Sequence, residues 1–358
     1  MDRITSIYLD VARFTAAVLV VLSHAPSFIG LNFGPLSSLG PEAVVVFFVL
    51  SGYVISYVTE TKEKRASDYF LARAKRIYSV LIPAMVVTVF ADYVGTQVDI
   101  GFYSDHGNFS NDYSITTVVS ILTFTGEVLS RHIVFGSNEP IWSLGFECVY
   151  YVIFGIVFFC KNRVAALMLS ALILIIAMPK VSVFFPLWLL GVAIQKYKNR
   201  MSGIISTIVF LCGALGILVI KYKFHGVTPM YKLGFGAHDF YKSVAYFYGI
   251  GVAFGLTVFV AKSAMEYVKG DRILVRYEAV IRWLSAKTFS LYIVHLPLMM
   301  LFVVSLGIQS LWQKIICLFL TIFTCFIFSE IFESKKGIYF VLISRLASLL
   351  HSNPPYRH

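Results

Sequence analysis

The first apolar stretch of the sequence contains two polar side chains that could take part in chemistry, Arg13 and His24. At 100° and 1.5 Å per helical residue, their spacing places them within ~20° on one helix face and ~16 Å apart. Asp10 lies one turn before Arg13, where it would partly neutralise the guanidinium. Because a charge near the bilayer centre costs several kilocalories, this stripe is expected to face a polar cavity. The alternative is a shallow arginine that extends to the headgroups and a histidine at the opposite membrane surface.

A second candidate group is the pair Arg73 and Arg76, which follows the second apolar stretch with i,i+3 spacing. A planar guanidinium binds phosphate in a bidentate manner, so two of them on one turn would hold a pyrophosphate or a 3′-phosphate. The alternative is that both are topogenic charges, which explains the number of basic residues here but not their pairing.

Two later apolar stretches each contain an ionisable residue, Glu147 and His295. An isolated carboxylate at the depth of Glu147 would be protonated or paired. His295 would lie ~16 Å from the inner end of its helix. These depths predict that His24, Glu147 and His295 all lie in the outer half of the membrane. For His295 the alternative is a histidine that only satisfies local hydrogen bonds.

Transmembrane helices must position these residues. Hydrophobic residues make up 58% of the 358-residue chain and charged residues only 14%, whereas soluble domains are about a quarter charged. The sequence therefore predicts an all-α polytopic membrane protein with about ten transmembrane helices. The predicted spans are 8–24, 41–58, 77–95, 142–160, 164–178, 181–195, 203–221, 243–261, 284–304 and 311–332.

Most of the 30 Lys and Arg residues fall on the loops that share a side with the N-terminus. Under the positive-inside rule, this asymmetry predicts that both termini are cytoplasmic. It also accounts for the net charge of +11 without a nucleic-acid partner.

Two segments outside the predicted spans have apolar character. Residues 114–124 lie in the longest outer loop and are too few to span, so they predict a re-entrant or interfacial helix. After residue 333, apolar and basic residues recur at helical spacing over 338–350. This pattern predicts that 334–358 form an amphipathic tail on the cytoplasmic leaflet.

Five motifs in chain order resemble the membrane-bound acyltransferase-3 family. They are Asp10-x-x-Arg13 followed by His24, Phe47-Phe48-Val-Leu-Ser51-Gly52, Arg73-Ala-Lys-Arg76, Trp142-Ser-Leu-x-x-Glu147 and Ser290-Leu-Tyr-Ile-Val-His295. The resemblance implies a ten-helix acyltransferase domain over residues 1–333. One departure is Glu333-Ser-Lys, where members commonly have Glu-x-Pro. Some members carry an additional extracytoplasmic esterase-like domain, and we expect this chain to be a standalone member without one.

The resemblance also implies a reaction. Members move an acyl group, usually acetyl, from cytoplasmic acyl-CoA to a hydroxyl of a glycan outside the membrane. By this resemblance the acceptor would be an O-antigen, an exopolysaccharide or a lipid-linked oligosaccharide. The protein would sit among the lipids of the cytoplasmic (inner) membrane, with acetyl-CoA as co-substrate and no metal. The residues tied to activity in the family correspond here to Arg13, His24, Arg73 and Arg76.

Together, these residues predict a mechanism. The CoA phosphates would dock on Arg73 and Arg76, and the pantetheine arm would pass Arg13 to bring the thioester toward His24. Neutral His24 would act as general base, because imidazole titrates near neutral pH. Glu147 would orient this imidazole, and His295 is a third candidate catalytic residue. Direct transfer and a transient acyl-His intermediate both remain open. Residues expected to bind substrate or support the fold are Asp10, Ser51, Trp142, Ser143 and Tyr292.

The main alternative is a membrane transporter, or an acyl-group translocator that hands the acyl group to a separate transferase. A secondary transporter typically has paired Gly- or Pro-broken helices in corresponding halves, and this sequence shows no such pair. The acceptor sugar, the acylated position, the acyl chain and the oligomeric state remain open.

Overall fold

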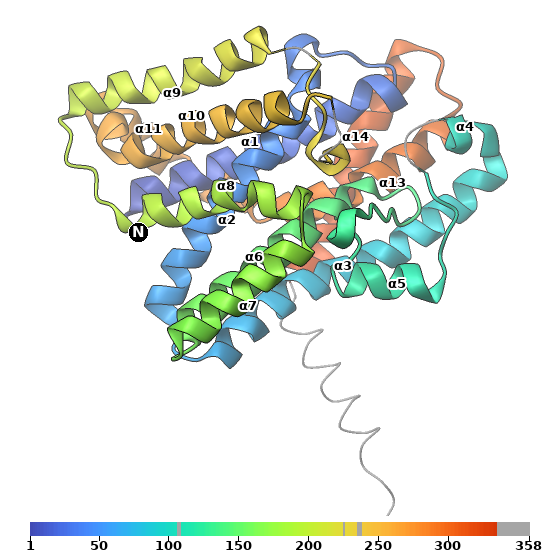
Figure 1. Cartoon of the computed structure of the whole chain (residues 1–358). Helices are drawn as coiled ribbons and strands as arrows, with labels where there is room; N and C mark the ends of the chain where they lie inside the picture. The colour runs from blue at the N-terminus through green and yellow to red at the C-terminus, as the bar shows by residue number, and fades with distance from the viewer. Residues whose placement is uncertain (106–108, 225, 235–237, 335–358) are drawn as a thin grey trace, which may run out of the picture.

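The computed structural model describes residues 1–105, 109–224, 226–234 and 238–334, and in these ranges the chain is helical with no strands (Figure 1). The long helices are α1 (Arg3–Phe28), α2 (Gly40–Lys62), α3 (Ala66–Val98), α6 (Trp142–Phe159), α9 (Gly203–Lys223), α10 (Phe240–Tyr267), α13 (Thr288–Leu306) and α14 (Leu311–Phe328). The shorter ones are α4 (Ile100–Asp105), α5 (Ile115–Leu122), α7 (Arg163–Ile176), α8 (Lys180–Lys196), α11 (Gly270–Arg276) and α12 (Glu278–Ser285).

The ten predicted spans all fall on helices. Eight helical stretches of the described chain are long and apolar enough to cross a membrane. The other two predicted spans coincide with α7, which has 14 residues, and α8, which has 17. The prediction of an all-α polytopic membrane protein is therefore confirmed. Several boundaries were wrong. For example, α13 begins at Thr288 rather than at residue 284, because residues up to Ser285 belong to the separate amphipathic helix α12.

The predicted short helix in the outer loop is present as α5. The Ser114 side chain accepts a hydrogen bond from the backbone N–H of Thr117 at its start. At its other end the Tyr78 hydroxyl donates to the carbonyl oxygen of Leu122, with 2.6 Å between the oxygens. Protein side chains therefore satisfy backbone groups at both ends, as a non-spanning helix at the membrane requires. The predicted tail, 334–358, lies outside the described residues except for Ser334.

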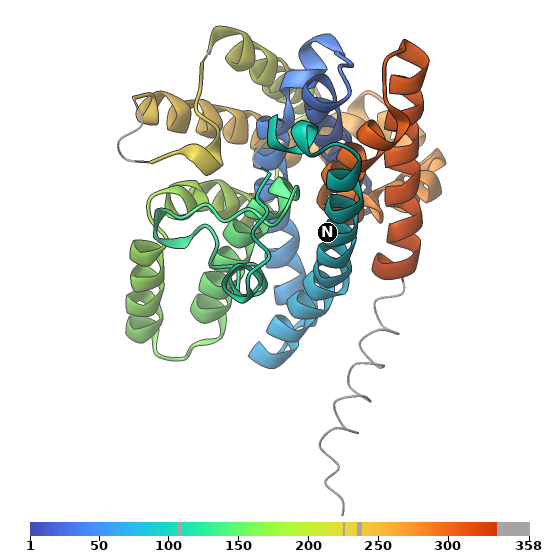
Figure 2. The same ribbon diagram turned by 90° about the vertical axis from the view of Figure 1, so that its right-hand side faces the viewer.

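The helices α1, α2, α3, α6 and α13 form the centre of the bundle. The α6–α7 pair, in green, and α14, in orange-red, lie on opposite sides of the molecule (Figure 2). In the most apolar stretch of α13, 67% of the residues are buried, whereas in that of α9 only 11% are. α9 packs on α10 at the edge of the bundle (Figure 1). Of the helices that carry the residues predicted to do chemistry, α13 is the most buried, and α1 and α3 are buried over 39% and 44% of their most apolar stretches.

Glycines allow α2 and α8 to pack backbone to backbone. A Cβ atom on Gly52 would lie 1.9 Å from the carbonyl oxygen of Trp188, and one on Gly191 would lie 2.0 Å from that of Val49. Small residues permit such close approach between membrane helices. Beside this crossing, Ser51 Oγ accepts a hydrogen bond from Trp188 Nε1 at 3.1 Å. The structure thus gives Ser51 a supporting role in the fold.

Candidate active site

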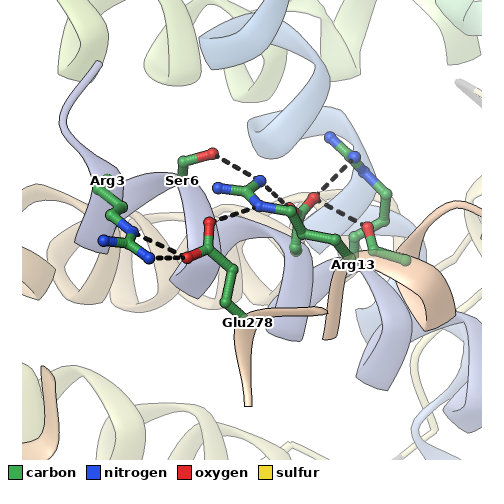
Figure 3. A network of polar contacts seen from close by, with 7 residues as sticks. Arg3, Ser6, Arg13 and Glu278 are labelled. Carbon is green, nitrogen blue, oxygen red and sulfur yellow. Dashed lines mark hydrogen bonds and ion pairs between the residues drawn. The ribbon is translucent and has the colours of Figure 1, made fainter. Parts of the chain in front are cut away.

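A polar network fixes Arg13 on the first helix (Figure 3). Asp10 accepts hydrogen bonds from Arg13 at 3.4 Å, from Ser285 at 2.9 Å and from Arg282 at 2.9 Å. Arg282 also bonds to Glu278 at 2.8 Å, and Arg3 pairs with the same carboxylate at 2.6 Å. Hydrogen bonds from these two guanidiniums, that of Arg3 first, lower the pKa of Glu278 below its usual value. The network ties α1 to α12 and holds the Arg13 side chain in place.

Three cavities lie in a row through the bundle. The proximal cavity, about 320 Å³, is lined by Arg13, Arg76, Thr288 and Glu333. The central cavity, about 60 Å³, is lined by Arg13, Arg76, Ser143, Glu147 and Tyr292. The distal cavity, about 240 Å³, is lined by His24, Glu139, Trp142, Tyr231 and Tyr292. Neighbouring cavities share lining residues, so the row runs from the Arg13 end of α1 to its His24 end.

Both ends of the row reach the surface. Arg76 and Ser334, which line the proximal cavity, are exposed, as is Ser38 at the distal cavity. Arg13 and His24 line different cavities along the same row. The predicted polar stripe on α1 therefore follows this passage through the bundle, as its spacing indicated.

His24 lies against a second histidine, His295 of α13. Their ring centroids are 5.3 Å apart. The Nδ1 atom of fully buried His295 is 3.0 Å from the carbonyl oxygen of Leu291 and 2.9 Å from that of Tyr292. Because a carbonyl can only accept, Nδ1 carries the proton and Nε2 is an acceptor. Within the described part of the chain, buried Nε2 has no hydrogen-bond partner.

Glu147 does not lie where the sequence predicted. We expected it to orient His24, but it lines the central cavity with Arg13 and Arg76 and is absent from the lining of the distal one. It also interacts with the Tyr151 hydroxyl, which is 3.1 Å from Ser51 Oγ. The physical reason is that depth along a helix does not determine the direction in which a side chain points. Glu147 thus faces the arginines rather than the imidazole.

The carboxylate that shares the cavity of His24 is Glu139, which the sequence analysis did not single out. It lies in the 3-10 turn η3 (Glu139–Ile141) before α6. The preceding loop is anchored by Asp92 of α3, whose Oδ2 accepts from the backbone N–H of Ser137 at 2.8 Å and from the Tyr113 hydroxyl at 2.7 Å. Burial, and then the bond to Asp92, raise the pKa of Tyr113, so this hydroxyl remains a donor.

Gly136 is required in the same loop. Its φ of +59° favours glycine, and a Cβ there would lie 2.1 Å from Asp92 Oδ2. One sequence signal could have drawn attention to Glu139. It is the run of a glycine, a polar residue and Asn138 just before the tryptophan motif.

Tyr292 lines both the central and the distal cavity, and its hydroxyl oxygen is 2.7 Å from that of Ser143, which lines the central one. The Tyr292 ring packs edge-on against Phe47 with centroids 5.5 Å apart. Trp142 packs edge-on against Phe146 at 5.1 Å. These contacts join α6, α13 and α2 around the passage, which is a supporting role for residues that the sequence had singled out.

The two arginines of the predicted phosphate site are separated in the structure. Arg73 is buried, forms an ion pair with Glu63 and stacks over the Tyr69 ring at 3.8 Å. Its Nη1 atom also donates to the Tyr69 carbonyl oxygen at 2.9 Å. Of Arg73 and Arg76, only Arg76 lines the proximal and central cavities. The expectation that both guanidiniums share one phosphate site is therefore wrong for Arg73, because the buried Glu63 carboxylate already holds it.

A multi-pass membrane protein with a row of cavities between an arginine-lined end and a histidine pair is compatible with group transfer across a bilayer. Comparison with known proteins identifies the class: the acyltransferase-domain family model matches residues 6–330. The chain therefore belongs to the acyltransferase-3 family.

One characterised relative is similar over part of its length. An O-acetyl transferase of Shigella phage Sf6 is 32% identical over 154 residues. The match covers 41% of this chain and 44% of the relative, less than half of each. No solved structure matches the chain.

Proposed function

We propose that the protein is an O-acyltransferase that moves an acetyl group from acetyl-CoA at the proximal cavity to a hydroxyl of a glycan at the distal cavity. The observation that carries the proposal is the row of cavities with Arg13 and Arg76 at one end and the His24–His295 pair at the other. Family membership supports acyl transfer. The printed name of the phage relative, an O-acetyl transferase, supports acetyl as the group and oxygen as its acceptor.

The proposed orientation places the proximal cavity in the cytoplasm, with the protein in the inner membrane. The basic loops on the proximal side support this orientation under the positive-inside rule. The exposed apolar faces of α9 and α14, which include Leu211, Leu218, Phe319 and Phe323, then contact lipid.

The donor end combines charge with a narrow passage. Arg76 binds a CoA phosphate with its planar guanidinium, and Arg13 adds a second positive charge deeper in the bundle. The central cavity, at about 60 Å³, is the smallest of the three. It therefore admits only a slender chain such as pantetheine, and the nucleotide stays in the proximal cavity. Arg73 positions the first turns of α3 through Glu63, one turn before Arg76.

The acceptor end supplies the base. Neutral His24 takes the proton of the acceptor hydroxyl as its oxygen attacks the thioester carbonyl carbon. The C–O bond forms, the C–S bond breaks, and the proton passes from His24 to the leaving CoA sulfur. Nε2 of His295 is beside the His24 ring and has no hydrogen-bond partner among the described residues; in the reacting complex it would accept a hydrogen bond from that ring and select its tautomer. Glu139, in the same cavity, stabilises the imidazolium that forms.

Acetyl transfer by purified protein in liposomes tests the proposal. Acetyl-CoA labelled in the acetyl group is supplied with surface polysaccharide of the source cells, O-deacetylated by mild alkali. We expect labelled ester on the glycan with the wild type and none with His24→Ala, which inserts equally because one uncharged substitution barely changes insertion. If label crosses the membrane but no glycan is esterified, the protein is instead a translocator that hands the acyl group to another enzyme. Wild-type rates with His24→Ala would refute the role of His24.

A further inference from the structure

A buried charged cluster lies beside the distal cavity and outside the residues used above. Glu127 and Lys180 form an ion pair at 2.9 Å, and their side chains are 2% and 5% exposed. His132 Nδ1 lies 2.6 Å from the other Glu127 oxygen. Replacing a buried ion pair with apolar residues often costs no stability, so such a pair suggests a role in positioning.

The cluster joins three segments that are distant in the sequence. The Lys180 ammonium, at the start of α8, donates to Glu127, to the carbonyl oxygen of Arg131 at 2.7 Å and to that of Tyr231 at 2.9 Å. These three bonds use all three ammonium hydrogens. Lys180 thus holds the loop around the 3-10 turn η2 (Val128–Ser130) against the turn η4 (Met230–Lys232).

The backbone near η2 is strained. Leu129 has a φ of +56° and Ser130 a φ of +60°, a region that residues with side chains rarely adopt. Such conformations persist only where the surroundings enforce them, and they concentrate at functional sites. The bond from Lys180 to the carbonyl of Arg131 is directly next to this strained pair.

The cluster contacts the Tyr231 side chain through His132. His132 stacks on its ring with centroids 5.0 Å apart and an angle of 29°. Lys232 Nζ lies 5.5 Å from the ring centroid. Trp142 packs against the same ring at 5.5 Å and 41°. Trp142 and Tyr231 both line the distal cavity, together with His24.

We propose that Trp142 and Tyr231 form an aromatic corner that binds a sugar ring of the acceptor, and that the Glu127–His132–Lys180 cluster positions Tyr231. The proposal rests on the acyl transfer proposed above. The C–H hydrogens of a pyranose ring carry partial positive charge and pack on the negative face of an aromatic ring. The corner fixes the sugar, and Glu139 in the same cavity accepts from its hydroxyls. The corner thereby selects which hydroxyl reaches His24.

Steady-state kinetics with acetyl-CoA and the O-deacetylated surface polysaccharide test this site. Tyr231→Ala is expected to raise KM for the glycan about tenfold, equivalent to about 1.4 kcal/mol, with KM for acetyl-CoA unchanged. Tyr231→Phe keeps the ring and should stay within twofold of the wild type. Tyr241→Ala is the matched control, because Tyr241 is 86% exposed and does not line the distal cavity. An unchanged glycan KM with Tyr231→Ala would overturn the proposal.

A second variant tests the positioning role. Lys180→Met should raise the glycan KM as Tyr231→Ala does, and the double variant should show no further increase, because both changes act through one ring. If Lys180→Met or Glu127→Gln lowers the melting temperature but leaves the glycan KM unchanged, the cluster only supports the fold. Absence of glycan acetylation by the wild type would instead refute the proposed function, so the two failures are distinguishable.

Discussion

His295→Phe is expected to slow acetyl transfer by acting on His24. The substitution keeps a ring of similar size in a fully buried position and removes both nitrogens. In the proposed mechanism, what is lost is one neutral hydrogen bond to the His24 ring. Such a bond contributes about 1 kcal/mol, and 1.36 kcal/mol corresponds to a factor of ten in rate. We therefore expect kcat to fall about fivefold, whereas His24→Ala removes the base itself and should cost about 10²- to 10⁴-fold.

The assay is a double-mutant cycle on initial rates of acetyl transfer. His295→Phe is measured in the wild-type protein and in His24→Ala. Because His295 acts through His24, it should have no effect on the residual rate of His24→Ala. The KM for acetyl-CoA should not change in any member of the cycle. Met299→Leu is the matched control, since Met299 is fully buried on the same helix and the change conserves apolar volume.

An equal loss of rate in both backgrounds would refute this reasoning. In that case His295 would influence the reaction through the packing of α13 rather than through the imidazole of His24. A loss of donor affinity with His295→Phe would also contradict the placement of the histidine pair at the acceptor end of the passage.

Three further predictions follow from the arginines, the orientation and the helix packing. Arg76→Lys should weaken acetyl-CoA binding about tenfold in a titration, because the bidentate fork is lost, whereas Arg73→Lys should lower the melting temperature and leave donor affinity unchanged. In a protein stripped of native cysteines, Ser38→Cys should react with an impermeant thiol reagent added outside cells and Ser67→Cys should not; the reverse pattern would invert the proposed topology. Gly191→Ala should prevent accumulation of folded protein in membranes, since its Cβ would lie 2.0 Å from a carbonyl oxygen of α2; normal yield and melting temperature would show that the two helices can separate.

Runs of apolar residues predicted the helices. A chain in lipid must satisfy its backbone hydrogen bonds within each span, and a helix does so. The stripe of Arg13 and His24 was likewise predictable, because it depends only on the geometry of one helix. The prediction failed where a second helix decides the outcome. Glu147 lies near the start of α6, but the rotation of α6 in the bundle turns it toward the arginines of the central cavity.

Arg73 and Arg76 show a second limit of sequence reasoning. Residues three apart differ by ~60° around a helix, which is enough for one to face a cavity and the other a buried neighbour. The neighbour here is Glu63, which lies between α2 and α3 and is 9% exposed. Nothing in the spacing of the arginines distinguishes the two orientations. Tyr231 was missed for a related reason: its carbonyl oxygen accepts a hydrogen bond from Lys180, which is distant in the sequence.

The short helix α7 has a consequence for the surrounding lipid. Its 14 residues extend about 21 Å at 1.5 Å per residue, whereas the hydrocarbon core of a bilayer is about 30 Å thick. A hydrophobic segment shorter than the core draws the two leaflets toward each other. We therefore expect the bilayer to be thinner beside α6 and α7 than on the flanks that α9 and α14 cover.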